Sequence, residues 1–262
     1  MKISVYCCKR AFETPKGMVA MQNTKNKKLL TLLPIFLIGE LCLLLTILFA
    51  ELDAVKYSYF CFFSIVLAFV FALGFLKKDL GVGLLLEGLL FSVCADVFLV
   101  LPLKYAYKNQ ILGVSFLSVV QIIYFLYFFF KTESKESRIV HGFARGIVIL
   151  AAELLTILIL KGKTDALAIL GTFYMANLLV SIVLAYMQGK KSLVFAIALT
   201  LLLCSGVFAG LSTAVSSYFQ VAETSFLYKL ANTDFNFVWL FYLPAQTLIA
   251  AYTALQSAQF KY

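Results

Sequence analysis

The chain has 262 residues, of which 63% are hydrophobic and only 13% are charged. Soluble domains carry about 45–50% apolar and about 25% charged residues, so this composition excludes an ordinary soluble protein and predicts a polytopic α-helical membrane protein. The formal net charge of +9 does not indicate nucleic-acid binding, because the basic residues lie between apolar segments and form no stripe with interleaved aromatic residues.

The first 28 residues are polar and basic, and we expect them to form a flexible N-terminal arm. Residues 29–258 are predicted to form a single domain, an all-α bundle of about eight transmembrane helices, because each crossing needs about twenty apolar residues. The predicted spans are Leu29–Ala50, Tyr57–Leu76, Gly81–Pro102, Ile111–Phe130, Gly146–Leu160, Asp165–Met187, Leu193–Ser217 and Asn236–Ser257. The fifth span is the weakest, and it reaches full length only if residues 139–145 belong to it.

The basic residues are distributed unequally between the two ends of the predicted spans. If the N-terminus lies inside, 16 lysines and arginines fall on inner segments and 6 on outer loops. Arg145, just before the fifth span, is counted with the inner ones. Because cytoplasmic segments carry the excess of basic residues, we expect both termini in the cytoplasm.

The third and seventh spans share a short motif. Asp96-Val97-Phe98 in the third matches Gly206-Val207-Phe208 in the seventh. Four spans separate the two sites, so both helices would run in the same direction. The match therefore suggests a parallel four-plus-four internal repeat.

Asp96 is a bare carboxylate inside the apolar third span, where a charge costs at least about 2.5–3.5 kcal/mol. Polar side chains spaced by three, four or seven residues occupy one face of four other spans. They are Ser118, Gln121 and Tyr124 in the fourth, Tyr174, Asn177 and Ser181 in the sixth, Ser205 and Ser212 in the seventh, and Tyr242 and Gln246 in the eighth. Two interpretations stay open: interhelical hydrogen bonds, worth about 0.6–2 kcal/mol each, or a polar cavity around Asp96.

Three further carboxylates lie inside predicted spans: Glu40, Glu87 and Glu153. Glu87 faces away from Asp96, because nine residues turn a helix by about 900°. The six cysteines have no CxxC spacing, and the single histidine, His141, lies in a predicted loop. This is no metal-ligand pattern, and we expect neither a metal ion nor another cofactor.

The stretch Gly88–Pro102, GLLFSVCADVFLVLP, resembles the first signature of the YhhN family of lysoplasmalogenase-type membrane proteins. Further positions that match the family are Gly113, Phe116 and Tyr124 and, in the run YLPAQTLIA of the last span, Tyr242 and Gln246. The resemblance implies an eight-span fold and hydrolysis of the vinyl ether bond of lysoplasmalogens, with a membrane lipid as the partner. The chain departs from the family pattern at three positions. It has Ala95 where the family has Gly, Gln121 where the family usually has His, and Gly206 where the family has a second Asp.

This implied chemistry explains the need for carboxyl groups. A vinyl ether is protonated on carbon by an acid, and water then attacks the resulting oxocarbenium ion. One carboxyl group must therefore be protonated, and a second, ionised group stabilises the cation or activates the water. An apolar bundle favours the neutral form of a carboxyl group, which suits Asp96 to the role of general acid.

The sequence thus leads to two functional hypotheses. The first is a lysoplasmalogenase-like hydrolase, in which either Glu40 or Glu153 substitutes for the second carboxylate that is missing at Gly206, or one carboxyl group suffices. The alternative is a non-catalytic lipid-binding or lipid-transporting protein of the same fold.

Overall fold

The structure, a computed structural model, describes residues 15–102, 106–132, 134–219, 221–233 and 235–258. These residues form α-helices and one short 3-10 helix, with no strand among them. The elements are α1 (Pro15–Phe49), α2 (Ala54–Leu73), α3 (Leu80–Leu99), α4 (Ala106–Lys131), α5 (Lys135–Leu160), α6 (Ala166–Met187), η1 (Gly189–Ser192), α7 (Leu193–Ser217), α8 (Phe226–Ala231) and α9 (Phe237–Ala258).

Eight of the described helices, α1 to α7 and α9, are long and apolar enough to cross a membrane. The prediction of an all-α, multi-pass membrane bundle is therefore confirmed. The internal repeat and the orientation of the termini stay predictions. The doubtful fifth span is a full helix, because α5 begins at Lys135 and takes in residues 139–145.

Two sequence assignments need correction. The predicted arm of residues 1–28 is helical in its second half, since α1 begins at Pro15; residues 1–14 lie outside the described part. His141 and Arg145, both assigned to the loop before the fifth span, lie inside α5. A helix can accommodate them because the polar start of α5 is followed directly by its apolar run.

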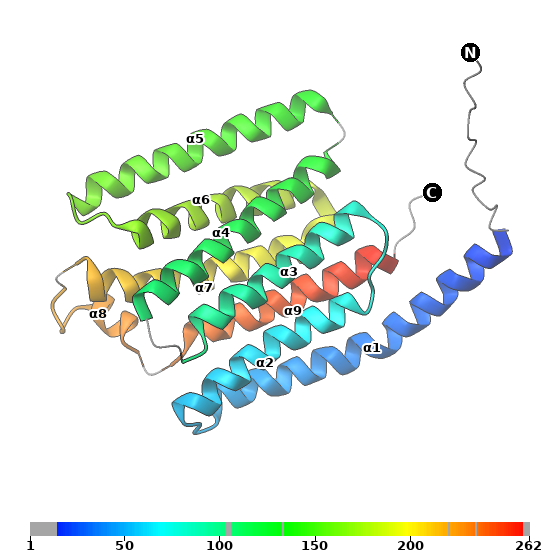
Figure 1. Ribbon diagram of the computed structural model, residues 1–262, viewed down its shortest axis with the longest axis horizontal. Coiled ribbons are helices and arrows are strands. Elements are labelled where there is room, and N and C mark those ends of the chain that lie inside the picture. The colour runs from blue at the N-terminus through cyan, green and yellow to red at the C-terminus, as the bar shows by residue number, and fades with distance from the viewer. Residues whose placement is uncertain (1–14, 103–105, 133, 220, 234, 259–262) are drawn as a thin grey trace, which may run out of the picture.

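The helices lie side by side in an elongated bundle, with α3, α4, α6, α7 and α9 in the middle (Figure 1). α5 packs on α6 along one edge, and α1 packs on α2 and α9 along the opposite edge. The start of α1 and the end of α9 lie at the same end of the bundle, as an even number of crossings requires.

α3 and α4 make the most extensive helix contact, because glycines let them approach closely. Gly88 of α3 lies against the ring of Tyr124, and Gly113 of α4 lies against the side chain of Leu99. These two antiparallel contacts fix the register of the pair. They place Asp96 level with Phe116.

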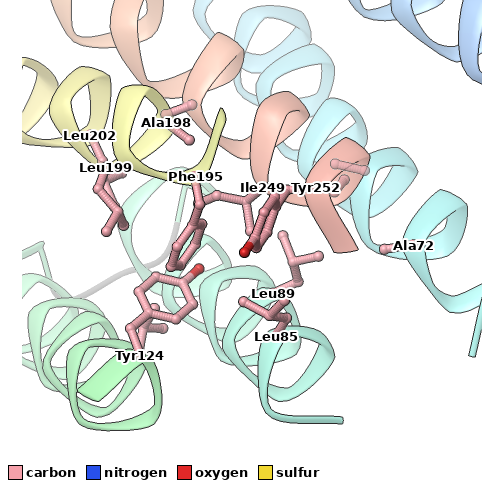
Figure 2. Packing of buried hydrophobic residues seen from close by; sticks show 14 of the residues in the cluster. Ala72, Leu85, Leu89, Tyr124, Phe195, Ala198, Leu199, Leu202, Ile249 and Tyr252 are labelled. Atoms are coloured by element: carbon pink, nitrogen blue, oxygen red, sulfur yellow. The ribbon is translucent and has the colours of Figure 1, made fainter. Parts of the chain in front are cut away.

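Aromatic rings pack among leucine, isoleucine and alanine side chains in the core between α3, α4, α7 and α9 (Figure 2). Phe195 stacks on Tyr252 with ring centroids 5.1 Å apart, and Tyr124 meets Phe195 edge-on at 5.2 Å. Beyond them, the Lys131 ammonium group donates to the hydroxyls of Tyr127 and Tyr252 at 2.9 and 3.0 Å. This end of the bundle is closed by packed rings and hydrogen bonds.

Candidate functional site

A cavity of about 760 Å³ lies between α3, α4, α5, α6, α7 and α9. Its walls come from the C-terminal parts of α3, α5 and α7 and the N-terminal parts of α4, α6 and α9. Because neighbouring spans run in opposite directions, all these parts lie in the same half of the bundle, away from Lys131. Most of the lining side chains are apolar.

Asp96 lies in the wall of this cavity, in the last turn of α3, and is only 2% exposed. The hydroxyl of Tyr242 on α9 donates to its two carboxyl oxygens, at 3.1 and 3.0 Å. The ring of Trp239 packs edge-on against the Tyr242 ring, with centroids 5.3 Å apart, and holds it in place. Asp96 is therefore bound by a neutral donor and, among the described residues, by no cation.

Two more residues that the sequence singled out, Tyr174 of α6 and Ser205 of α7, also line the cavity. The hydroxyl of Tyr174 is close enough to Asp96 and to the hydroxyl of Tyr242 for electrostatic interaction. The structure thus brings four of the candidate residues to one cavity.

Gly206 lies in the same wall, beside Ser205. A Cβ atom built at Gly206 would lie 2.7 Å from Sδ of Met175 and 3.3 Å from Cε1 of Tyr174. The position at which the resemblance implies a second aspartate therefore borders the cavity, and the rings and side chains of α6 occupy the space beside it.

Asn177 and the backbone oxygen of Gln121 belong to a different polar cluster, centred on Arg145 of α5. The side-chain amide of Gln121 does not line the cavity and is buried without a hydrogen-bond partner among the described residues. Arg145 is only 5% exposed. Its Nε donates to Oδ1 of Asn177 at 2.6 Å, its Nη2 to the backbone oxygen of Gln121 at 3.0 Å, and its guanidinium carbon lies 4.5 Å from the centroid of the Phe125 ring. No carboxylate in the described part of the chain pairs with it. Of the two interpretations that the sequence left open, the structure favours an interhelical hydrogen bond for Asn177 and not a place in the cavity of Asp96.

Tyr124 and Gln246 do not line the cavity either. In the α3–α4 register, Tyr124 is level with Gly88, eight residues or about 12 Å along α3 from Asp96. Gln246 lies one turn beyond Tyr242 on α9. The Tyr124 hydroxyl and the Gln246 amide are buried without a hydrogen-bond partner among the described residues. These two polar groups therefore lie inside the bundle but outside the cavity wall.

The two proposed replacement carboxylates do not reach the cavity. Glu40 lies on α1, which packs on α2 and α9; it is 2% exposed and does not line the cavity. Glu153 lies on α5 between the lining residues Ala152 and Thr156 but does not itself line the cavity. No described interaction joins either carboxyl group to Asp96. Among the residues that the structure describes, Asp96 is the single carboxylate in the wall.

Sequence reasoning did not identify a polar cluster beside the cavity, at the N-terminus of α6. Asp165, the N-cap of α6, accepts hydrogen bonds from the hydroxyls of Tyr218 at 2.6 Å and Tyr107 at 2.8 Å, and from the Ala168 N–H at 2.9 Å. Tyr218 lines the cavity. The tyrosines near the ends of predicted spans were the available signal, because such rings gather at membrane interfaces.

We expect Asp165→Asn to lower stability at neutral pH by about 1 kcal/mol, because hydrogen bonds to a charged acceptor are stronger than those to a neutral one. Slight burial opposes ionisation, but the hydrogen bonds from Tyr218, Ala168 and Tyr107 outweigh it and hold the pKa of Asp165 below its usual value. A lowered pKa in the folded state stabilises the protein above the unfolded pKa of about 3.9, and this stabilisation is lost as pH falls through the folded pKa.

The measurement is the thermal midpoint in detergent from pH 7 down to pH 3. The difference between wild type and Asp165→Asn should shrink toward the acidic end. The matched variant Asp79→Asn changes an N-cap that accepts from the Val82 N–H and from no tyrosine hydroxyl. An equal loss in both variants would contradict the role assigned to the tyrosines.

Comparison with known sequences gives one match. The sequence model described as the YhhN family matches residues 57–253, from the fourth residue of α2 to near the end of α9. The matched part contains Asp96, Tyr174, Gly206 and Tyr242. Among curated proteins and among solved structures, no match to the chain is found. In the described residues no cluster of three or more His, Cys, Asp or Glu could hold a metal ion.

Proposed function

The chain belongs to the YhhN family, and on this premise we propose that it is a membrane hydrolase that cleaves the vinyl ether bond of lysoplasmalogens. Asp96 is the general acid. The observation that carries the proposal is a buried carboxyl group, held by one neutral hydroxyl, in the wall of a mostly apolar cavity.

The surroundings of Asp96 favour its neutral form. Removing a carboxylate from water without a cation beside it is costly, and no cation contacts Asp96 among the residues described. The Tyr242 hydroxyl fixes the direction of the carboxyl group. A protonated acid is what the first step of vinyl ether hydrolysis requires.

The steps follow from this arrangement. Asp96 donates its proton to the vinyl carbon remote from the ether oxygen, and the positive charge develops on the other carbon and the oxygen. The Asp96 carboxylate that forms stabilises this oxocarbenium ion, and the Tyr242 hydroxyl now donates to a charged acceptor, which is a stronger hydrogen bond. Water adds to the cationic carbon, and its proton returns to Asp96. The hemiacetal then collapses to a fatty aldehyde and a glycerophospho-alcohol.

The cavity suits a lipid with one chain. Its volume of about 760 Å³ is within the range of about 300–1,000 Å³ typical of small-molecule sites. Apolar walls from α4, α5 and α6 would hold an alkyl chain, and Tyr218, which lines the cavity and bonds to Asp165, would contact polar groups. With both termini in the cytoplasm, this half of the bundle lies toward the opposite side of the membrane.

The experiment is to incubate the purified protein in detergent with 1-alkenyl lysophospholipid and to measure released aldehyde. We expect aldehyde from this lipid and none from the matched 1-alkyl lysophospholipid, which has the same head group and chain but no double bond to protonate.

The second candidate is a lipid-binding or lipid-transporting relative without catalysis. The observation that favours it is Gly206, which leaves one carboxylate in the cavity wall. Saturable binding of both lipids without any aldehyde would support this candidate and contradict the hydrolase.

A further inference from the structure

We propose that Tyr174 positions the attacking water at Asp96, by accepting a hydrogen bond from that water through its hydroxyl oxygen. The inference rests on the proposed hydrolase function and adds a second residue to its mechanism. It follows from a comparison of two hydroxyls in the cavity wall, one that forms hydrogen bonds within the protein and one that does not.

The hydroxyls of two tyrosines in the cavity wall, Tyr242 and Tyr174, interact electrostatically with Asp96. That of Tyr242 is engaged, because it donates to both oxygens of the carboxyl group. That of Tyr174 forms no hydrogen bond with any residue in the described part of the chain. Tyr174 is 6% exposed and lines the cavity. A nearly buried hydroxyl without a protein partner is costly unless a ligand or water satisfies it.

The ring of Tyr174 packs closely against α7. Its Cε1 lies 3.3 Å from the point where a Cβ atom of Gly206 would be. Because glycine has no side chain, the ring can pack this close to the backbone of α7. A ring confined in this way can hold a water molecule in a fixed direction, as positioning requires.

The role is consistent with the proton balance of the reaction. Water forms its C–O bond to the oxocarbenium carbon and gives one proton to the Asp96 carboxylate. Its other proton stays in the hydrogen bond to Tyr174 and remains with the new hemiacetal hydroxyl. Tyr174 neither gains nor loses a proton, so it acts as a positioning residue.

The test compares Tyr174→Phe with Tyr124→Phe. Both changes remove the hydroxyl of a buried tyrosine, and neither hydroxyl has a hydrogen-bond partner among the described residues, but only Tyr174 lines the cavity. For Tyr174→Phe we expect kcat for aldehyde release to fall roughly 10–100-fold, with KM within about twofold of wild type, because misplacing a reactant costs up to about 100-fold. Tyr124→Phe should keep wild-type kcat, and both variants should keep the wild-type thermal midpoint.

A second variant tests whether the loss of kcat in Tyr174→Phe comes from the missing hydroxyl beside Gly206. In the Tyr174→Phe background, Gly206→Asp brings an acceptor beside the lost hydroxyl, after a shift of the flexible Met175 side chain and a smaller shift of the ring at position 174, whose Cε1 lies 3.3 Å from the added Cβ atom. We expect it to restore at least part of kcat. A change in folding alone would not be reversed by adding a buried carboxylate.

The results separate this inference from the proposed function. If wild type releases no aldehyde, the hydrolase and the role of Tyr174 both fail. If wild type is active and Tyr174→Phe retains its kcat, or raises KM alone, the function stands and the role of Tyr174 is wrong. An equal loss in Tyr124→Phe would also overturn it.

Discussion

Asp96→Asn is expected to abolish aldehyde release, with a loss of kcat of at least about 10²–10⁴-fold, the contribution of a positioned general acid. Asparagine has the size of aspartate and can still bond to the Tyr242 hydroxyl, so the bundle should fold as before. An amide cannot give a proton to carbon at neutral pH. The measurement is steady-state aldehyde release from the 1-alkenyl lipid by the purified variant.

Glu87→Gln is the matched control for this change. Glu87 lies on the same helix but is exposed and does not line the cavity. Removing its charge should leave kcat within about twofold of wild type. If Asp96→Asn were as active as wild type, the chemistry would not take place at this end of α3, and the proposed mechanism would be wrong.

Gly88→Ala is expected to give the largest loss of stability among single small substitutions in α3. The added Cβ atom would lie 2.5 Å from Cε1 of Tyr124 and 3.2 Å from its Cζ. Tyr124 cannot easily move, because it is fully buried and its ring packs against Phe195. α3 and α4 must therefore separate, at a cost of about 1–3 kcal/mol. The thermal midpoint in detergent measures this loss.

Gly83→Ala isolates the packing contribution. Gly83 is on the same helix, and a Cβ atom there would have no neighbour within 4 Å. Both substitutions gain about 1 kcal/mol of helix propensity, so Gly83→Ala should be neutral or stabilising. If the two variants had equal midpoints, close packing of α3 on Tyr124 would not contribute to stability.

The sequence alone determined the class of the protein and its eight spans. This was possible because the membrane acts locally: each crossing must satisfy its backbone internally and carry about twenty apolar residues, whatever its neighbours are. The same constraint made Asp96 conspicuous, since a carboxylate inside an apolar run is costly wherever the helix lies. The short signature around Asp96 and the run from Tyr242 then indicated the family, which the match over residues 57–253 confirms.

The boundaries of α5 show where this local rule becomes weak. His141 and Arg145 lower the hydropathy of its first half, so the sequence placed them in a loop. In the structure Arg145 is buried against Asn177, the backbone of Gln121 and the Phe125 ring. These oxygen and ring contacts come from α4 and α6. These contacts cannot be predicted from the sequence of α5 alone.

Only the tertiary structure decided which polar residues share a site. Tyr174 and Asn177 are three residues apart and so lie on one side of α6, yet Tyr174 lines the cavity of Asp96 and Asn177 bonds to Arg145. Helical spacing gives a direction around the helix axis, but three residues also advance about 4.5 Å along it, and the neighbouring helices differ at the two levels. The same holds for Glu40, which is buried on α1, a helix that packs on α2 and α9. Spacing along one chain segment fixes a face, whereas the packing of several helices fixes what that face meets.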